Sequence, residues 1–391
     1  MSGEIGVGLV GYRFMGRAHS NAYRQVARFF DVDPAPRMRV LCGRDEAAVR
    51  EAANSLGWEG YETDYARMLE RDDIGLVDIS SSGETHHEFA LAALEAGKHV
   101  LCEKPLANTL SEAREMAEAA RRAGTVNMVC HNYRRVPAVG LAKKLIDEGR
   151  IGEIRHWRAV YLQDWLLDPM SPLTWRLRKE TGGAGPLADL GSHLVDLVHF
   201  LVGPITEVVG TAETFVKERP LPASDGDRPK MGEVTVNEAA AFLARFEHGA
   251  MGTFEVSPLV PGRKARESFE INGSKGSVLF DLERMNELEV YFEDDPAEVS
   301  GFRRILVTEP EHPYVEGWWP PGHALGYEHT FVHTVKDLLD GIKAGKSPAP
   351  TFEDGYRTQA VIDAVERSVE SREWTVPAVY EPQAGEIGAN R

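Results

Sequence analysis

The amino-acid sequence predicts an α/β domain with a parallel sheet in residues 1–130, followed by an α+β domain with a large, mostly antiparallel open sheet in residues 131–391. In the first third, short apolar runs alternate with amphipathic stretches of helical length, a pattern that is typical of βαβ units. After Gly152, helical patterns become rare, and runs that alternate polar and apolar residues dominate. A chain of 391 residues has room for two domains of this size.

Five apolar runs in the first domain predict the strands of the parallel sheet. These runs are residues 5–10, 38–42, 76–80, 99–102 and 126–130. Helical patterns between them cover residues 15–30, 47–56, 88–96 and 109–122. The last of these helices begins with Thr109 and Glu112, a spacing that caps a helix by reciprocal hydrogen bonds. Because strands and helices alternate, helices should cover both faces of the sheet.

Seven runs in the second domain alternate polar and apolar residues and predict the strands of the antiparallel sheet. They are residues 155–161, 206–216, 240–246, 252–257, 268–272, 277–281 and 288–292. Two helices are expected near the end, at residues 327–344 and 354–371. Residues 217–230 and 312–323 contain several prolines and are expected to be long loops. The residues after Val379 are expected to form a loose tail.

The formal net charge of −17 limits which partners the protein can have. So acidic a chain repels nucleic acid and anionic membranes, and no apolar run approaches the ~20 residues that cross a bilayer. The first residues lead directly into a strand, so we expect no signal peptide. The three cysteines form no CxxC pair, which argues against a disulfide framework or a structural zinc site. We therefore expect a cytoplasmic protein that binds neither nucleic acid nor membrane.

A glycine-rich turn joins the first strand to the first helix. Gly11 permits a tight turn, Gly16 permits close packing of helix on strand, and the helix N-terminus can face a pyrophosphate. This is the position of the dinucleotide-binding fingerprint, although Arg13 replaces the middle glycine that lets the backbone approach phosphate. We expect Gly11, Arg13, Phe14 and Met15 to contact a cofactor. A plain strand–turn–helix connection is the alternative.

The end of the second strand bears on the choice between NAD and NADP. NAD enzymes usually place an acid there to bind the ribose 2′-hydroxyl. This sequence has Gly43 and Arg44, which leave space and positive charge for a 2′-phosphate, followed by Asp45, which keeps NAD open. The cofactor is therefore expected to be NAD or NADP, with a slight preference for NADP. Arg44 could instead be a solvated residue at the start of the next helix.

Lys104 follows the fourth predicted strand, within Glu103-Lys104-Pro105. Open α/β sheets bind ligands at the carboxyl ends of their strands, and this lysine lies there. A lysine so placed can hold a substrate hydroxyl and stabilise the alkoxide that develops during hydride loss. Most lysines are simply surface residues, which is the alternative reading.

Asp189 and His193 follow a glycine-rich run that starts at Gly182. If both lie on one helix, the spacing of four puts carboxylate and imidazole on one face. The pKa of a histidine suits it to remove a hydroxyl proton, and a neighbouring acid raises its basicity. Asp196 lies one turn further on, so a metal site is a weaker alternative, and we expect no metal. The plainest alternative is an incidental pair on an amphipathic helix.

Over nearly its whole length the sequence resembles the Gfo/Idh/MocA family, the glucose–fructose oxidoreductase and inositol dehydrogenase group. The resemblance rests on Glu103-Lys104-Pro105, preceded by the run 96–100, and on the glycine-rich run that leads to Asp189 and His193. It implies a Rossmann domain, and a second domain whose open sheet often mediates oligomers, hence a homodimer or homotetramer. It also implies that Lys104, Asp189 and His193 form the catalytic group.

The loop after the third predicted strand departs from the family. Ser82 and Gly83 stand where the family commonly has Pro-Asn, while His86 matches. Cofactor contacts from this loop are therefore less certain, although its backbone can still line the nicotinamide side. Beyond the turn and the second strand, the expected cofactor contacts are Ser80, Ser82, His86, Glu103, Lys104 and Asn132.

Two further segments are similar to family members that act on sugars and anhydrosugars. They supply Tyr133 and Arg134 in one segment, and Gln163, Asp164 and Trp165 in the other. These polar groups can pair with hydroxyls, and Trp165 offers a flat face to sugar C–H groups, although core packing is equally open for it. Together with Lys104, Asp189 and His193, the expected substrate contacts are therefore Tyr133, Arg134, Gln163, Asp164, Trp165 and Trp175.

The sequence thus predicts an NAD(P)-dependent dehydrogenase that oxidises a secondary hydroxyl of a cyclic sugar, anhydrosugar or polyol. A non-catalytic NAD(P)-binding sensor of the same fold is one alternative. A dehydrogenase acting on a non-sugar or a nucleotide sugar is another, and an elongated basic pocket would favour the nucleotide sugar. A metal-dependent dehydrogenase is the weakest, because no further His or Cys lies near Asp196 at ligand spacing.

Overall fold

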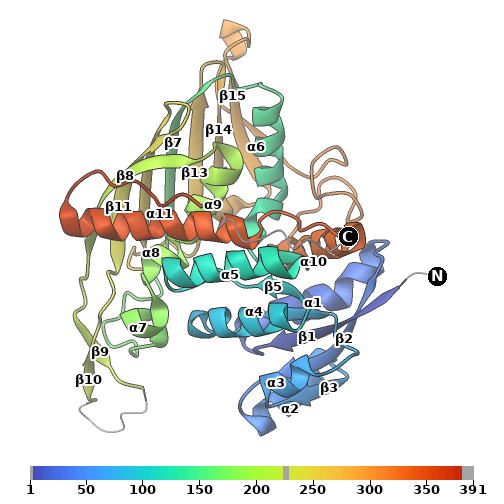
Figure 1. Ribbon diagram of the computed structural model, residues 1–391. Helices are drawn as coiled ribbons and strands as arrows, with labels where there is room; N and C mark the ends of the chain where they lie inside the picture. The colour runs from blue at the N-terminus through green and yellow to red at the C-terminus, as the bar shows by residue number, and fades with distance from the viewer. Residues whose placement is uncertain (1–2, 223–228, 381–391) are drawn as a thin grey trace, which may run out of the picture.

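The computed structural model describes residues 3–222 and 229–380. Figure 1 shows its two sheets one above the other, with the N-terminal sheet below and the large C-terminal sheet above. The long helix α11 (Phe352–Ser371) runs between them. Both sheets have the class that the sequence predicts, so the predicted fold class is confirmed.

The lower sheet has six strands, all parallel, in the order β3-β2-β1-β4-β5-β6. The strands are β1 (Glu4–Val10), β2 (Ala35–Cys42), β3 (Gly60–Glu62), β4 (Leu76–Ile79), β5 (His99–Cys102) and β6 (Asn127–Val129). In this order the chain reverses its direction of travel across the sheet between β1 and β4. Ligands of open α/β sheets bind at such a switch point, outside the carboxyl ends of the strands.

Helices connect these strands on both faces. They are α1 (Phe14–Phe29), α2 (Glu46–Leu56), α3 (Tyr65–Leu69), α4 (His86–Glu95) and α5 (Leu110–Ala123). The predicted cap of the last helix is present, because Thr109 and Glu112 exchange side-chain and backbone hydrogen bonds. The short elements β3 and α3 have no counterpart among the predicted elements. None of the three β3 residues is fully buried, so this strand carries no apolar signal.

The upper sheet has eight strands in the order β16-β15-β14-β13-β7-β12-β11-β8. All neighbours are antiparallel except β7 and β12, which are parallel. The strands are β7 (Ile154–Leu162), β8 (Ile205–Glu213), β11 (Ala239–Phe246), β12 (Met251–Ser257), β13 (Arg266–Gly273), β14 (Gly276–Asp281), β15 (Glu287–Phe292) and β16 (Arg303–Leu306). All seven predicted runs are strands, and β16 is an addition.

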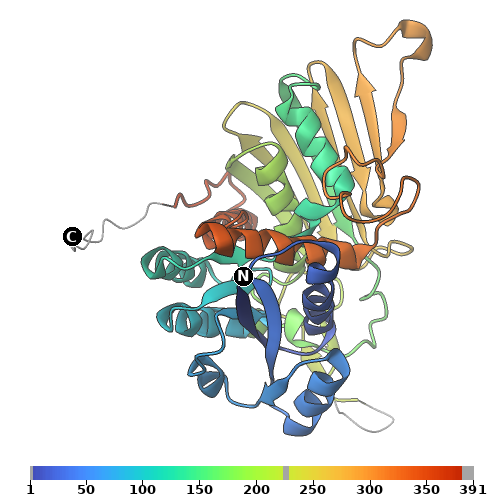
Figure 2. The same ribbon diagram turned by 90° about the vertical axis from the view of Figure 1, so that its right-hand side faces the viewer.

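One face of the upper sheet is covered by helices and the other is open. The covering helices are α6 (Pro137–Asp147), α9 (Gly191–Leu201) and α11 (Figures 1 and 2). Aromatic rings fill the core under them, with Trp157 stacked on Phe269 at 5.2 Å between ring centroids. The open face is concave, with a hollow of about 640 Å³. Strand alternation produces this asymmetry, since successive residues point to opposite faces.

A small two-stranded arm follows β8. The arm pairs β9 (Glu218–Pro220) with β10 (Met231–Glu233). The predicted loop 217–230 therefore contains a strand, and its residues 223–228 lie outside the described residues. The predicted loop 312–323 contains no strand or helix within this described stretch. The predicted tail after Val379 lies outside the described residues from position 381 onward.

The two C-terminal helices pack back against the first sheet. Phe331, Val335 and Leu339 of α10 (Tyr327–Ala344) belong to the same hydrophobic core as residues of α1. The first turns of α11 join another core of the lower sheet, whereas its later turns join the core of the upper sheet. One helix thus ties the two sheets together. The division at residue 130 stays a prediction.

Within residues 3–222 and 229–380, no helix is long and apolar enough to cross a bilayer.

Candidate active site

The residues predicted to bind a cofactor lie at one edge of the six-stranded sheet. They follow β1, β2, β4, β5 and β6, so each lies at or beyond the carboxyl end of a parallel strand. These ends meet at a common edge, and the switch point between β1 and β4 lies in its middle. The parallel topology therefore gathers residues that lie as far apart in the sequence as Gly11 and Asn132.

The glycine-rich turn has the geometry of a dinucleotide cradle. Gly11 has a φ of +99°, and a Cβ there would lie 2.8 Å from the Ser80 carbonyl oxygen. A Cβ on Gly16 would lie 2.1 Å from the carbonyl oxygen of Gly11. Only glycine fits at either position, and Gly16 lies in the first turn of the 16-residue helix α1, which begins at Phe14. Arg13 is exposed, and the glycine geometry of the turn together with the helix N-terminus fits a pyrophosphate.

The end of β2 is more crowded than the sequence suggests. A Cβ on Gly43 would lie 2.3 Å from the Tyr12 ring, so that ring occupies the space above Gly43. Asp45 caps α2, and its side chain accepts a 3.0 Å hydrogen bond from the Ala48 backbone N–H. Arg44 is exposed. Positive charge is thus available at this edge, while one carboxylate oxygen of Asp45 is already engaged.

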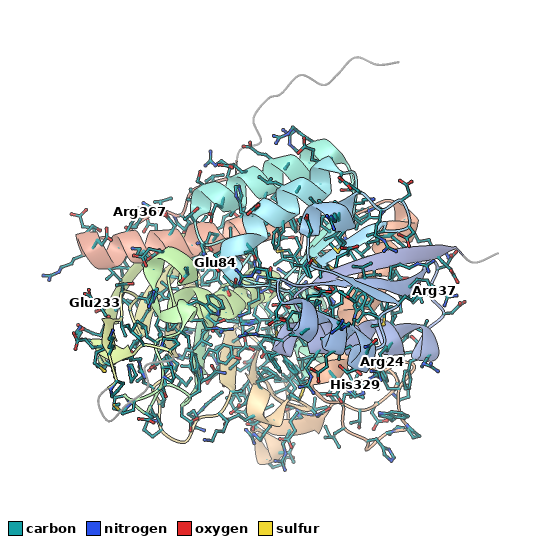
Figure 3. The ribbon with its side chains drawn as sticks, turned by 90° about the horizontal axis from the view of Figure 1, so that it is seen from below. Arg24, Arg37, Glu84, Glu233, His329 and Arg367 are labelled. Atoms are coloured by element: carbon teal, nitrogen blue, oxygen red, sulfur yellow. The ribbon has the colours of Figure 1, made fainter. Side chains whose placement is uncertain are left out.

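The loop after β4 is held by hydrogen bonds to its neighbours. Ser80 donates to the Val10 carbonyl at 3.1 Å, and Ser82 donates to Glu84 at 3.2 Å. The buried His86 ring lies 2.9 Å from the Pro105 carbonyl oxygen and so joins this loop to the one that carries Lys104. In the view from below, Glu84 lies near the middle of the molecule, between Arg37 and Glu233 (Figure 3).

Lys104 and Asp189 form the central ion pair of the site. The Lys104 ammonium lies 2.7 Å from the Asp189 carboxylate and 2.9 Å from the Asp189 carbonyl oxygen. Burial alone would raise the pKa of Asp189, but Lys104 and Arg176 outweigh it and lower that pKa. The Arg176 guanidinium is 3.6 Å from the same carboxylate. Asp189 is therefore an anion that orients two cations.

The predicted helical pairing of Asp189 with His193 is wrong. Asp189 ends the short helix α8 (Pro186–Asp189), and α9 starts afresh at Gly191, so the two residues lie on separate helices. Leu190 between them is a turn residue, and Asp189 is not among the groups that shift the pKa of His193. The glycine-rich run before it forms α7 (Lys179–Gly182) and two left-handed glycines, Gly183 and Gly185.

His193 is buried among aromatic and cationic groups. Its ring lies 4.6 Å from the Tyr133 ring and 5.8 Å from the rings of Tyr161 and His131, measured between centroids. Burial, together with the charges of Lys104 and His131, lowers the pKa of His193 well below its usual 6.5. We expected Asp189 to raise the basicity of His193, and this expectation is therefore also wrong. A neutral imidazole is nevertheless the form that a proton acceptor requires.

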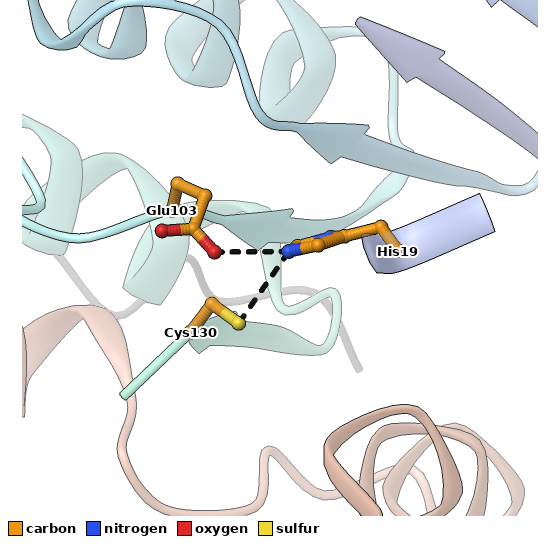
Figure 4. Close-up of side chains that lie close together, drawn as sticks. All are labelled: His19, Glu103 and Cys130. Carbon is orange, nitrogen blue, oxygen red and sulfur yellow. Dashed lines mark hydrogen bonds and ion pairs between the residues drawn. The ribbon is translucent and has the colours of Figure 1, made fainter. Parts of the chain in front are cut away.

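A buried hydrogen-bond cluster includes Glu103, the residue that precedes Lys104 (Figure 4). The His19 ring lies 2.8 Å from Asp78 and 2.9 Å from Glu103, and the Cys130 sulfur is 3.7 Å from the same ring. Glu103 also accepts a 3.2 Å hydrogen bond from the Lys104 backbone N–H. Burial opposes a charged imidazole, but Asp78 and Cys130 raise the pKa of His19 well above 6.5. A cation between two carboxylates thus links α1, β4 and the start of the Lys104 loop.

The predicted substrate residues fall into two groups. Tyr133 lies in the site, with its hydroxyl 3.1 Å from that of Tyr161 and its ring against His193. Arg134 is committed elsewhere, because it is buried and donates two hydrogen bonds to Asp196 at 2.8 and 2.7 Å. Its guanidinium group is therefore already paired with Asp196 and is not a free donor for a substrate hydroxyl.

The remaining substrate residues lie just beyond β7 and before α7. Gln163 accepts a 2.9 Å hydrogen bond from the Trp165 indole, and that indole ring is 43% exposed. Asp164 pairs with Lys264 at 2.6 Å. The Arg176 guanidinium lies 4.3 Å from the centroid of the Trp175 ring, so Trp175 contacts a cation that also contacts Asp189. Asn132 donates a 2.8 Å hydrogen bond to Thr330, which joins the edge to α10.

Several residues of the site were not among the predicted ones. They are His19, His131, Tyr161, Glu267 and Tyr327. His131 follows β6 directly, so the same strand-end rule that selects Lys104 would have selected it. Tyr327 begins α10 and stacks on Phe14 of α1 at 6.2 Å between ring centroids. Only a C-terminal helix that returns to the first sheet brings it there, and the local pattern gives no sign of that return.

Known proteins share this arrangement. A family model described as an oxidoreductase family with an NAD-binding Rossmann fold matches residues 5–131, and one described as the GFO/IDH/MocA C-terminal domain matches residues 139–279. The levoglucosan dehydrogenase of Pseudarthrobacter phenanthrenivorans is 41% identical over 388 residues, which span 96% of this chain and 99% of that protein.

Solved structures agree with this relationship. An oxidoreductase domain protein from Kribbella flavida is 55% identical with a TM-score of 0.93, covering 97% of this chain and 100% of that one. A levoglucosan dehydrogenase in complex with NADH and levoglucosan is 40% identical with a TM-score of 0.92, covering 96% of this chain and 99% of that one. The family resemblance expected from the sequence is confirmed.

Proposed function

The chain belongs to the Gfo/Idh/MocA family of oxidoreductases, and we propose that it oxidises a secondary hydroxyl of a cyclic sugar, anhydrosugar or polyol with NAD or NADP as the acceptor. The observation that carries this proposal is the pair Lys104–Asp189 beside the neutral His193, at the edge that also holds the dinucleotide turn. The relatives named as levoglucosan dehydrogenase, 1,5-anhydro-D-fructose reductase and myo-inositol 2-dehydrogenase support the substrate class.

Each of the three residues has a distinct part in the proposed reaction. The neutral His193 imidazole takes the hydroxyl proton, since a protonated ring could not. The Lys104 ammonium stabilises the negative charge that develops on the substrate oxygen. Asp189 keeps this ammonium in place through a carboxylate and a carbonyl contact. A nicotinamide bound at the sheet edge supplies the hydride acceptor.

The substrate would lie against aromatic and polar side chains on the upper-sheet side of these residues. Tyr133 supplies a hydroxyl next to His193, and Gln163 and Trp165 extend the polar and flat surfaces beyond β7. Polar groups next to a flat aromatic ring match a sugar, which presents hydroxyls around its rim and C–H groups on its faces. A nucleotide sugar would demand a further basic channel.

Some observations favour NADP as the cofactor and others favour NAD. The exposed Arg44 and the engaged carboxylate of Asp45 support NADP, the cofactor slightly preferred from the sequence. The Tyr12 ring above Gly43 and the NADH named with the levoglucosan dehydrogenase structures support NAD. Binding of either dinucleotide is part of the proposal, and the preference for NADP stays a prediction.

The open face of the upper sheet is proposed to contact a second copy of the chain. This face mixes apolar and charged side chains, among them Leu243, Arg158 and Glu255, and its hollow spans several strands. Leu243 is 42% exposed although it lies in a central part of a strand. The change Leu243→Asp should therefore shift a dimer or tetramer toward the monomer in analytical ultracentrifugation. A wild-type chain that sediments as a monomer would overturn this part of the proposal.

A matrix of both cofactors against sugars, anhydrosugars, inositols and glycosides tests the proposed reaction. Nicotinamide absorbance reports turnover, and the Lys104→Ala variant serves as the inactive reference. Levoglucosan with NAD is the first combination to try. Absence of turnover over the whole panel would favour the non-catalytic sensor instead. The expected cytoplasmic location stays a prediction.

A further inference from the structure

Glu267 is a fully buried acid that the proposed reaction does not use. It lies on β13, and its side chain has an exposed fraction of 0%. Among the described residues, neither carboxylate oxygen has a hydrogen-bond partner. Burying a carboxyl group without partners is costly, so such a group is rare unless something else satisfies it.

The register of the sheet places Glu267 next to the active site. Glu267 lies directly opposite Tyr161 in the antiparallel pair β13–β7, and opposite residues point to the same face. The Tyr161 ring is 5.8 Å from the His193 ring, and its hydroxyl is 3.1 Å from that of Tyr133. Further along the same face, Phe269 stacks on Trp157. Glu267 is thus the acid at the end of an otherwise apolar stripe, where the stripe reaches the catalytic histidine.

Other buried polar atoms around His193 also lack partners. Within the described part of the chain these are His193 Nδ1, His131 Nδ1 and the Ser192 hydroxyl. The His131 ring is 5.8 Å from the His193 ring, and Ser192 precedes His193 in α9. Buried polar atoms without partners, from α9 and from the loop after β6, are therefore found at and near the proposed base. A polyhydroxylated ligand offers the groups that they lack.

The protonation state of Glu267 suits a hydroxyl partner. Burial raises its pKa well above 4.5, the anionic Asp196 raises it further, and Lys104 opposes both. The raised pKa favours the neutral carboxyl group, which has one O–H donor and one carbonyl acceptor. A neutral carboxyl group can donate to a hydroxyl oxygen and accept from a hydroxyl proton, whereas a carboxylate can only accept.

We propose that Glu267 binds a hydroxyl of the sugar substrate remote from the oxidised carbon, and so determines which sugars the site accepts. The proposal rests on the proposed function, because it needs a hydroxylated ring next to Lys104 and His193. Glu267 would be a specificity-determining residue, with no part in the proton transfer. It would discriminate between sugars because a ligand without the hydroxyl leaves the buried carboxyl group unpaired.

Two variants separate this role from a purely structural one. Glu267→Gln keeps a donor and an acceptor, so the KM of the sugar should rise less than about 10-fold. Glu267→Met removes both, and the KM should rise by about 10- to 200-fold while kcat changes less. The same Met variant removes an unpaired buried polar group, so its melting temperature should stay the same or rise by roughly 2 to 4 °C. Activity and stability thus move in opposite directions.

The experiment measures KM and kcat for levoglucosan, or for the best substrate of the panel, together with analogues that each lack one hydroxyl. One analogue should carry a KM penalty in the wild type that disappears in Glu267→Met, as in a double-mutant cycle. The control Glu270→Gln changes an acid of the same strand on the open face and should leave KM unchanged. NADH affinity verifies that each variant retains its cofactor site.

Three outcomes decide the matter. A KM that is unchanged in both Glu267 variants would overturn this inference and leave the proposed function intact. So would a Met variant that loses sugar and NADH binding together with its melting transition, since the carboxyl group would then be a structural element. Absence of wild-type turnover on every sugar would overturn the proposed function, and this inference with it.

Discussion

The Lys104 ammonium lies between two oxygens of a single residue, 2.7 Å from the Asp189 carboxylate and 2.9 Å from the Asp189 carbonyl oxygen. Asp189 therefore orients the lysine and does not pair with His193 four residues later. This contact determines what Asp189 and His193 each do in the site. The anion holds the cation, and the neutral histidine remains free to accept a proton.

Removal of the lysine side chain should abolish most of the activity. In Lys104→Ala the developing alkoxide loses its cation, and kcat/KM should fall by about 10²- to 10⁴-fold. Steady-state kinetics on the best sugar measures this effect, and Lys346→Ala, which changes an exposed lysine, is the control. Near-normal turnover of Lys104→Ala would contradict the role assigned to Lys104.

The pH profile should reflect the lowered pKa of His193. Burial, Lys104 and His131 keep the ring neutral as the pH falls through 6.5, and the neighbouring Tyr133 and Tyr161, whose pKa values are raised above 10, add no negative charge at that pH. The active form is the unprotonated one, so kcat/KM for oxidation should keep its plateau through pH 6.5 and fall only well below it. An acidic limb centred at or above pH 6.5 would be incompatible with this base. His193→Asn should lower the plateau.

Close packing at the glycine turn makes it sensitive to one methyl group. In Gly16→Ala the new Cβ would lie 2.1 Å from the Gly11 carbonyl oxygen, so α1 must move away from the turn. NADH binding, followed by fluorescence titration, should weaken at least ~10-fold because the backbone donors shift from the pyrophosphate. Gly301→Ala is the matched control, since no atom lies within 4 Å of the added Cβ. Unchanged NADH affinity in Gly16→Ala would show that phosphate is bound elsewhere.

The cluster around His19 should contribute strongly to stability. His19→Leu leaves Asp78 and Glu103 buried without their shared cation, which costs about 3–5 kcal/mol of unfolding free energy in urea titrations. The folded-state pKa of His19 is raised, so its contribution is complete below pH 6.5 and is lost as the pH rises through the folded value. The difference between wild type and variant should therefore shrink at alkaline pH.

The control for this prediction is an exposed ion pair near the amino ends of β1 and β2, away from the candidate site. Arg37 contacts Glu4 at 2.7 Å, and both side chains are about half exposed. Arg37→Ala should leave the unfolding transition unchanged. A His19→Leu variant as stable as Arg37→Ala would mean that the cluster is not charged as described.

Arg44 should decide the cofactor preference. If it contacts a 2′-phosphate, Arg44→Ala should weaken NADPH binding about 10-fold or more and leave NADH binding nearly unchanged. Parallel titrations with both dinucleotides measure the ratio. Equal losses for both, or no loss at all, would remove the basis for preferring NADP.

Much of the fold was predictable because it depends on short-range patterns. The run 5–10 and the turn at Gly11 identify β1 and its cradle, since a tight turn and a close helix are properties of adjacent residues. Polar and apolar residues alternate along β11, and buried and exposed side chains alternate in the same way in the structure. The sequence could therefore identify β11 as a strand with one face in the core. The three-residue strand β3 was not, because it has neither an apolar run nor a period.

The proposed catalytic residues illustrate where local reasoning ends. Lys104 could be located from the strand that precedes it, because the carboxyl end of a parallel strand is a local feature. The spacing of Asp189 and His193 predicted contact on one helix, but the break at Leu190 separates them. A single helix break has no reliable signal in a glycine-rich run, where several turn geometries fit the same residues.

The sequence by itself determined the two sheet classes, the dinucleotide turn and the place of Lys104, since each depends on residues within one strand–turn–helix unit. Only the tertiary structure decided that Asp189 binds Lys104 across 85 residues, that His19 lies between two carboxylates, and that Glu267 is buried beside Tyr161. These relationships depend on which strands become neighbours and on how closely the two sheets pack. Burial then sets the charge of each group, and burial is a property of the whole fold.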